Sequence, residues 1–268
     1  MAAQKLSNDV TISYHDSGSG TPILFLHSFG HNKNLWFPQL THFLDKGFRV
    51  LAPDMPGHGD SSYDPARHGV DQMAQCYIEL LDCLEIKKAI LVGISMGGYI
   101  VLRMWARRPD LIAAMVLSNT KAEKDSDEIV ARRRAQIENI TSNGLEYFVT
   151  TGAPKRLSPV TLQRRPWVLD TIKLLNLTVP AAVNAATLEA MAQKEDDTKV
   201  LPTIDVPVLV TSGSDDTFIP KQSPGNLHRG IKGSRFHEIA GTGHVSSLEA
   251  PTEYNRIMEE FLQAAGFM

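Results

Sequence analysis

One serine in the sequence lies in a motif that is typical of nucleophilic catalysis. Ser95 is central in Gly93-Ile94-Ser95-Met96-Gly97, which follows a short apolar run and precedes an amphipathic stretch. Flanking glycines let the chain make a sharp strand-to-helix turn without Cβ clashes, and that turn leaves the serine exposed at the start of a helix. There the helix dipole and the N–H of Met96 would face a developing oxyanion. The motif predicts Ser95 as a nucleophile, against the alternative of an ordinary glycine-rich turn.

A serine hydroxyl is a poor nucleophile near neutral pH, so this hypothesis requires a base, for which histidine is the usual choice. In the expected topology the acid and then the base follow the serine, each in a loop after a late strand. Of the nine histidines, only His228, His237 and His244 come late enough. His237 lies in an apparent strand and His228 in polar, loop-like sequence. We predict His244 as the base, because it follows two glycines in a loop between the last strand and the last helix.

The acid is expected in the loop after the strand that ends at Ser212, where two aspartates stand side by side. Asp216, three residues after Gly213 and four before Pro220, is the predicted acid. It would hold the imidazole in the tautomer that accepts the serine proton, and it would stabilise the imidazolium that results. Asp215 is expected to be a turn or helix-cap residue.

A second oxyanion donor is expected in the loop after the strand at 23–26. We predict the backbone N–H of Phe29, which would act together with the N–H of Met96. His27, in the same loop, is expected to be a structural histidine bonded to backbone groups. His27 and His31 have no third ligand at a suitable spacing, so neither a metal nor a cofactor is predicted.

The elements that must position these residues follow a clear order. Short apolar runs alternate with amphipathic stretches, which is typical of an α/β fold with a mostly parallel central sheet flanked by helices. The stretch 10–15 is expected to be an edge strand, and Pro109 ends one of the helices. The other expected strands are 23–26, 48–51, 89–92, 114–117, 206–211 and 235–239, and the expected helices are 35–44, 72–84, 99–107 and 252–265.

The middle of the chain has a different character. Residues 120–199 are rich in Arg, Glu, Gln and Ala, with helical periodicity and no convincing strand. We predict a core formed by 1–119 and 200–268, with 120–199 as an inserted helical cap. The basic triplet at 132–134 is expected on a solvated helix face, with carboxylate or phosphate binding as the alternative. The apolar side chains expected either as pocket walls for an apolar acyl chain or as core packing are Trp167, Leu169, Ile172, Leu174 and Leu175.

Composition narrows the function classes. The 268 residues carry a formal net charge of -3 and 43% hydrophobic residues, which is ordinary for a soluble globular protein and lacks the basic footprint of a nucleic-acid partner. Without an apolar leader or a run of about 18 apolar residues, we expect a cytoplasmic protein that has no membrane partner. Cys76 and Cys83 lie about two turns apart on an expected helix and are predicted to be buried free thiols. A homodimer remains possible.

Five motifs together resemble the α/β-hydrolase superfamily in order and spacing. The resemblance covers 10–118 and 200–265. Within the superfamily, the sequence is similar to small capped esterases, 3-oxoadipate enol-lactonases and acyl-homoserine lactonases. One departure is Ser28, where the family often has glycine. The motifs are His27-Ser28-Phe29-Gly30, 54–59, 93–98, 213–220 and Gly243-His244. The resemblance implies an α/β-hydrolase fold, and Trp36 matches a family tryptophan; the substrate contacts that we predict are Trp36, Trp167, Phe218 and Val245.

These observations predict serine-dependent hydrolysis of a small carboxylic ester or lactone through an acyl-enzyme, without a cofactor. The substrate is expected to be an enol-lactone, an acyl-homoserine lactone or a simple ester. Two alternatives use the same three residues, namely carbon–carbon bond hydrolysis and cofactor-free perhydrolysis. An alternative of another class is a small-molecule receptor on a hydrolase scaffold.

Overall fold

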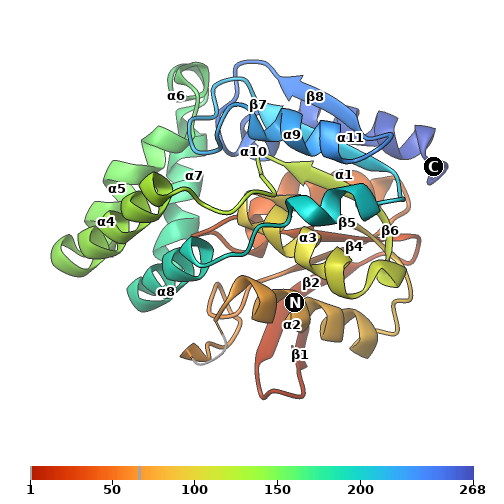
Figure 1. The fold of residues 1–268 in the computed structure, drawn as a ribbon, viewed down its shortest axis with the longest axis horizontal. Coiled ribbons are helices and arrows are strands. Elements are labelled where there is room, and N and C mark those ends of the chain that lie inside the picture. The colour runs from red at the N-terminus through yellow and green to blue at the C-terminus, as the bar shows by residue number, and fades with distance from the viewer. Residues whose placement is uncertain (1, 66–67) are drawn as a thin grey trace.

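The computed structural model describes residues 2–65 and 68–268, and this part of the chain is built around a sheet of eight strands (Figure 1). Their order is β1-β2-β4-β3-β5-β6-β7-β8. The pairs β1–β2 and β2–β4 are antiparallel, and all other pairs are parallel. The strands are β1 Ala2–Lys5, β2 Thr11–Ser17, β3 Pro22–Leu26, β4 Arg49–Pro53, β5 Ala89–Ile94, β6 Ile112–Ser118, β7 Val208–Gly213 and β8 Arg235–Ile239. The predicted mostly parallel sheet is confirmed.

Helices cover both faces of the sheet. The helices α2 (Val70–Cys83), α3 (Met96–Arg107) and α9 (Ser223–Gly230) contribute to one apolar cluster, and α1 (Phe37–Asp45) and α11 (Pro251–Ala264) to the other. Every residue of β5 is buried, because helices pack on both faces of this central strand. Strands buried on both faces carry continuous apolar runs, which explains the sequence pattern at 89–94. The short elements are η1 Lys33–Trp36, η3 Pro109–Leu111, η5 Thr198–Thr203 and α10 Ser246–Glu249.

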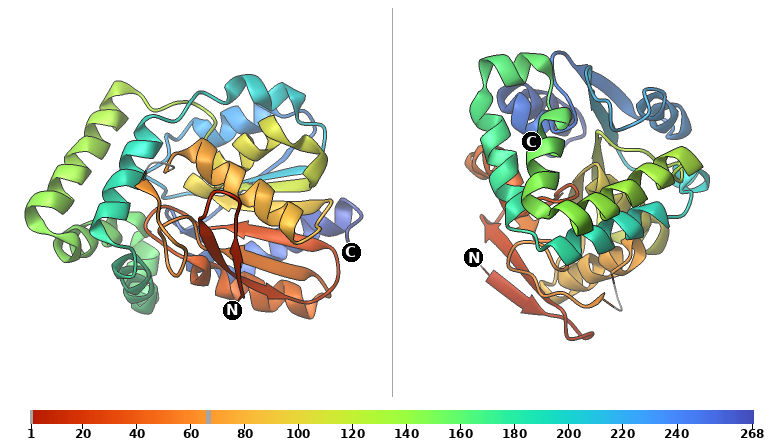
Figure 2. Two further views of the ribbon diagram at one scale, coloured as in Figure 1. Left: turned by 90° about the horizontal axis from the view of Figure 1, so that it is seen from below. Right: turned by 90° about the vertical axis from the view of Figure 1, so that its left-hand side faces the viewer.

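The segment between β6 and β7 forms a helical layer at one end of the core, seen at the left of Figure 1 and from its outer side in the right panel of Figure 2. Its elements are α4 Asp127–Asn143, α5 Leu145–Gly152, η4 Ala153–Arg156, α6 Pro159–Arg164, α7 Pro166–Leu177 and α8 Ala181–Ala192. We call 127–192 the cap helices. They contact the loop after β3, since the Arg156 guanidinium donates to the Phe29 carbonyl at 3.1 Å. The cap helices therefore lie over the carboxyl ends of the parallel strands.

Several sequence expectations need correction. The stretch 10–15 is not an edge strand, because β2 pairs with both β1 and β4 and the edge is β1. His228 lies in helix α9 rather than in a loop. Cys76 is buried as expected, whereas Cys83, the last residue of α2, is exposed to solvent. Among the described residues, no helix combines the length and apolar character needed to cross a membrane.

Candidate active site

The turn between β5 and α3 places Ser95 in a backbone conformation that few residues adopt. Ser95 has φ 54° and ψ −116°, and φ in this left-handed region is strained for a residue with a side chain. The strain is held from both sides, because the Ser95 N–H donates to the Ser118 carbonyl at 2.9 Å and Thr120 donates to the Ser95 carbonyl at 2.7 Å. The glycines are required by close approach: a Cβ on Gly97 would lie 2.2 Å from the Leu26 carbonyl oxygen. The sharp turn expected from the sequence is present.

The structure brings Ser95, His244 and Asp216 together in one hydrogen-bonded chain. His244 Nε2 lies 2.9 Å from the Ser95 hydroxyl oxygen. On the other side of the ring, His244 Nδ1 lies 3.1 and 3.0 Å from the two oxygens of Asp216. The Ser95 and His244 side chains are 149 residues apart in sequence and both come from loops at the carboxyl ends of strands. This geometry fits a serine whose proton passes to an imidazole that a carboxylate orients.

The carboxylate of Asp216 is surrounded by donors. Its Oδ1 accepts the N–H of Phe218 at 2.8 Å, and its Oδ2 accepts from the amide of Asn119 at 3.0 Å. Burial alone would raise the pKa of Asp216, but the adjacent His244 and the accepted hydrogen bonds lower that pKa below its ordinary value. Asp216 therefore stays ionised at neutral pH and can stabilise an imidazolium.

Asn119 is a site residue that the sequence interpretation missed. It is fully buried, and its backbone has φ 46°. Its amide nitrogen donates to both Asp216 and the Gly243 carbonyl, and its oxygen accepts from Ser246 at 2.6 Å. Asn119 thus links the acid loop to the base loop. Its place directly after the strand at 112–118 was the available signal, because polar residues at strand ends gather at one sheet edge.

The predicted oxyanion donors lie beside the serine. Met96 is the first residue of α3, where the N–H groups of the first turn have no acceptor within the helix. Phe29 and Ser95 line one crevice, together with Ser28 and His244. Ser28, the departure from the usual glycine, donates or accepts a 2.5 Å hydrogen bond with His31 Nδ1. This contact ties the loop to itself and leaves Phe29 at the crevice.

The histidines of the neighbouring loops are structural. The two ring nitrogens of His27 bond to the Ser28 carbonyl and to the N–H of Met55, as expected for a loop histidine. Burial lowers the pKa of His27 to about 4 and that of His58 to about 3, so both rings are neutral at pH 7. Within 2–65 and 68–268 no group of three or more potential ligands could hold a metal ion.

The crevice at Ser95 lies beside a larger cavity that the cap helices border. The crevice itself has a volume of about 40 Å³, and the neighbouring cavity about 360 Å³. Four side chains border both spaces, namely Arg132, Gln136, Arg156 and Phe218. Because the crevice is so much smaller than the cavity, we expect the bulk of an organic substrate to lie in the cavity.

Only one of the four predicted substrate contacts lines these spaces. Phe218 borders both, and its ring stacks on His244 with centroids 5.1 Å apart. Trp36 is fully buried in the core, where its ring packs against the rings of Phe25 and Tyr254. Val245 is buried against cap residues, whereas Trp167 is 60% exposed on the outside of α7. The structure does not bring these three to the crevice.

The other cap side chains divide in the same way. Ile172 and Leu175 are buried in packing, and Leu174 is 67% exposed, so none of them lines the crevice or the cavity. The basic triplet is not a uniform solvated face: Arg133 is largely buried and pairs with Asp125, while Arg132 borders the cavity. The lining residues that sequence reasoning missed include Tyr99, Gln136, Arg156, Leu188, Met191 and Ile219. No sequence signal marks most of them, since helix packing alone decides which face meets the crevice.

The fold and the site together define a class of protein. Its members have a mostly parallel sheet, a serine on a strained strand-to-helix turn, and a histidine–aspartate pair within hydrogen-bond distance of that serine. A family model described as "alpha/beta hydrolase fold" matches residues 21–251. The chain therefore belongs to the alpha/beta hydrolase fold family, and it is a hydrolase.

Known proteins extend the likeness over almost the whole chain. The chain is 29% identical to 3-oxoadipate enol-lactonase 2 of Acinetobacter baylyi, over 96% of this chain and 95% of that protein. A thermophilic esterase from Thermogutta terrifontis superimposes with a TM-score of 0.92 at 28% identity, covering 98% of both chains. The enol-lactonase from Burkholderia xenovorans LB400 gives 0.89 at 27% identity, covering 98% of this chain and all of that one.

Proposed function

We propose that the protein hydrolyses a small carboxylic ester or lactone through a covalent acyl-enzyme on Ser95. The observation that carries this proposal is the continuous hydrogen-bonded chain from the Ser95 hydroxyl through His244 to Asp216. An esterase and two enol-lactonases among the similar proteins support an oxygen ester or a lactone as the substrate.

The first half-reaction forms the acyl-enzyme. Ser95 Oγ attacks the carbonyl carbon while its proton passes to His244 Nε2. The carbonyl oxygen becomes an oxyanion, which the N–H groups of Met96 and Phe29 stabilise. The intermediate then expels the alcohol oxygen, which takes the proton from His244. In a lactone this step opens the ring, and the alcohol stays attached to the acyl chain.

The second half-reaction restores the enzyme. A water gives its proton to His244 and attacks the acyl carbon, and the new intermediate expels Ser95 Oγ, which regains a proton from the imidazole. Each time the ring becomes positive, the ionised Asp216 stabilises it. The lowered pKa of Asp216 keeps this carboxylate charged at neutral pH.

The decisive experiment replaces the nucleophile. We expect Ser95→Ala to lower kcat by at least about 10⁴-fold while the fold is retained, because Ser95 is the crevice alcohol bonded to His244, the imidazole that Asp216 orients. Wild-type protein should react once with a fluorophosphonate at Ser95, and the variant should not, as intact mass spectrometry would record. Ser19→Ala, in an exposed loop far from the crevice, is the matched control.

A substrate panel separates the alternatives that use the same residues. Esters and lactones should turn over repeatedly, whereas vinylogous diketones and peracid formation should be slower. Repeated turnover confined to the diketones would replace the proposal by carbon–carbon bond hydrolysis. A single slow cycle with every substrate would replace it by a receptor, and retained activity in Ser95→Ala would end it.

A further inference from the structure

One buried cation beside the active site has no anionic partner. Arg156 is 7% exposed, and its guanidinium donates a hydrogen bond to the Phe29 carbonyl at 3.1 Å. The guanidinium carbon also lies 5.4 Å from the Phe29 ring centre and 6.0 Å from that of Phe218. In the described part of the chain no carboxylate lies within ion-pair distance of Arg156, and burial lowers its pKa.

Two other partly buried arginines, Arg133 and Arg103, are neutralised by aspartates. Arg133 pairs with Asp125, and Arg103 pairs with Asp197 at 2.9 Å. A buried charge costs several kcal/mol unless it is paired, so folds normally supply such a carboxylate. Burial lowers the pKa of Arg156 to about 10, which still leaves the side chain protonated at neutral pH. Arg156 is thus a stable, uncompensated positive charge.

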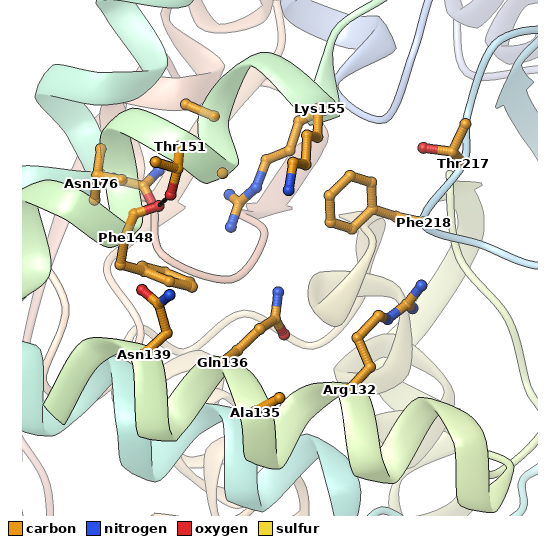
Figure 3. Close-up of a pocket in the computed structure, with 14 residues that line it drawn as sticks. Arg132, Ala135, Gln136, Asn139, Phe148, Thr151, Lys155, Asn176, Thr217 and Phe218 are labelled. Carbon is orange, nitrogen blue, oxygen red and sulfur yellow. Dashed lines mark hydrogen bonds between the residues drawn. The ribbon is translucent and has the colours of Figure 1, made fainter. Parts of the chain in front are cut away.

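The position of Arg156 gives this charge a direction. Arg156 borders both the crevice that holds Ser95 and His244 and the larger cavity under the cap helices. Two more cations line that cavity, Arg132 from α4 and Lys155 from η4, and Figure 3 shows both side chains reaching toward it. None of the 14 residues that line the cavity is an aspartate or glutamate. The whole space beside the nucleophile is therefore electropositive.

We propose that the substrate is itself an anion: a small ester or lactone that carries a free carboxylate, which Arg156 binds while Ser95 attacks the ester carbonyl of the same molecule. This inference rests on the proposed function and names the substrate class of that site. The planar guanidinium fork matches a carboxylate with two parallel N–H donors, so Arg156 fixes the distance between the charged end and the scissile carbonyl. The exposed Arg132 and Lys155 draw the anion into the cavity.

Two of the Arg156 contacts have structural consequences that the test must separate from substrate binding. Its backbone carbonyl accepts the N–H of His244 at 2.7 Å, and a side-chain substitution leaves this bond in place. Its side chain holds the Phe29 carbonyl, so a substitution can alter the loop of the predicted oxyanion donor. That effect would act equally on neutral and anionic substrates. The informative quantity is therefore the ratio of their kcat/KM values.

The experiment compares two methyl esters of equal chain length. Monomethyl adipate ends in a carboxylate where methyl hexanoate ends in a methyl group, and hydrolysis is followed by methanol release. We expect wild-type protein to prefer the anion by at least about 10-fold in kcat/KM, since a charge-assisted hydrogen bond contributes a factor of about 10 to 100. Arg156→Gln should abolish this preference, and Arg156→Lys should retain part of it. Adipate should inhibit wild-type protein competitively and should inhibit Arg156→Gln at least about 10-fold more weakly.

Matched variants test the outer cations. Arg132→Gln should raise KM for the anionic ester severalfold without changing kcat. The effect should shrink at high salt, because Arg132 is exposed to solvent and its attraction for the anion is screened. Arg134→Gln on the same helix and Arg164→Gln at the end of α6 are exposed, lie outside the cavity lining and should leave the ratio unchanged.

The outcomes separate this inference from the proposed function. Turnover of the neutral ester without any preference for the anion would overturn the inference and leave the hydrolase proposal standing. An equal loss of both activities in Arg156→Gln would show that Arg156 only positions the Phe29 loop, and would also overturn it. No turnover of either ester or of any lactone would remove the proposed function itself.

Discussion

The loops at the carboxyl ends of the strands and the cap helices are held in place by different forces. In the loops, backbone groups fix the chemistry: Ser95 is tied to β6 and Thr120, and Asp216 accepts backbone and amide donors. In the cap helices, apolar packing and ion pairs predominate, and α4 buries a single side chain of its 17 residues, Ile140. Main-chain geometry therefore positions the reacting groups, whereas side-chain packing and charge shape the surface beside them.

The two regions also differ in what titrates. Three buried histidines, His27, His31 and His58, and the half-buried His68 lie within 27–68, whereas 120–199 contains no histidine. The cap helices instead supply the cations Arg132, Lys155 and Arg156 to the cavity. We therefore expect low pH to destabilise the loop region, and high salt to weaken the binding of an anion under the cap helices.

The largest expected effect tests the rigid side of this comparison. Asp216→Asn keeps the shape of the carboxylate but removes its charge, and the amide would favour the wrong tautomer of His244. We expect kcat to fall about 10³- to 10⁴-fold, measured with the best ester of the panel. Asp215→Asn is the adjacent control and should stay within a few-fold of wild type, because its contacts are to the turn at 214 and 242. Equal losses in both variants would refute the assignment of the acid.

The next effect concerns acid stability. Burial lowers the pKa of His27 and His68 to about 4 and that of His58 to about 3, below the ordinary 6.5 of the unfolded chain. Above pH 6.5 the neutral rings make their full contribution to the free energy of unfolding. Between pH 6.5 and 4 the unfolded chain binds protons that the folded protein does not. The free energy of unfolding should therefore fall as pH drops, by about 1.4 kcal/mol per pH unit for each ring.

Urea unfolding at pH 7, 6 and 5 measures this dependence. His58→Gln should flatten the pH dependence by about one ring's share. His228→Gln changes an exposed ring outside the loops and should leave the slope unchanged. An unaltered slope in His58→Gln would contradict the assignment of acid sensitivity to these buried rings.

The smallest effect contrasts two positions of α7 in the cap helices. Ile172 is fully buried against Val168 and Val245, whereas Leu174 is 67% exposed. Ile172→Ala should lower the free energy of unfolding by about 2 to 4 kcal/mol through lost contacts and a cavity. Leu174→Ala should change it by less than about 0.5 kcal/mol. A pronounced loss in Leu174→Ala, together with weaker ester binding, would show that the outer face of α7 takes part in function.

Local patterns were sufficient for the elements and for the reacting groups. The glycines around Ser95 predicted the turn from the sequence alone. A Cβ at these positions would clash with backbone atoms, so the need for glycine is a local constraint. The loop order Ser95, Asp216, His244 followed from strand order, since parallel strands deliver their carboxyl ends to one edge. The prediction that 10–15 forms an edge strand was wrong, because it depended on a distant neighbour. The pattern at 10–15 does not show that β1 pairs with β2.

The predicted pocket walls show where local reasoning stops. Trp36 and Trp167 were chosen for residue type and for their place along the chain, yet one lies in the core and the other faces solvent. Arg156, within a polar stretch, carried no signal at all. Whether an arginine is paired depends on which acids other helices bring near it, and that is a property of packing.

Residue types and their spacing were enough to predict the class of fold, the sharp serine turn and the order of Ser95, Asp216 and His244, because each depends on backbone sterics and on strand order. Packing between distant segments, in contrast, sets which cap side chains face the nucleophile, links the acid and base loops through Asn119, and buries Arg156 without a carboxylate beside it. Those facts arise where segments far apart in sequence meet, and the free energy of such contacts is set by the three-dimensional arrangement and not by any one segment.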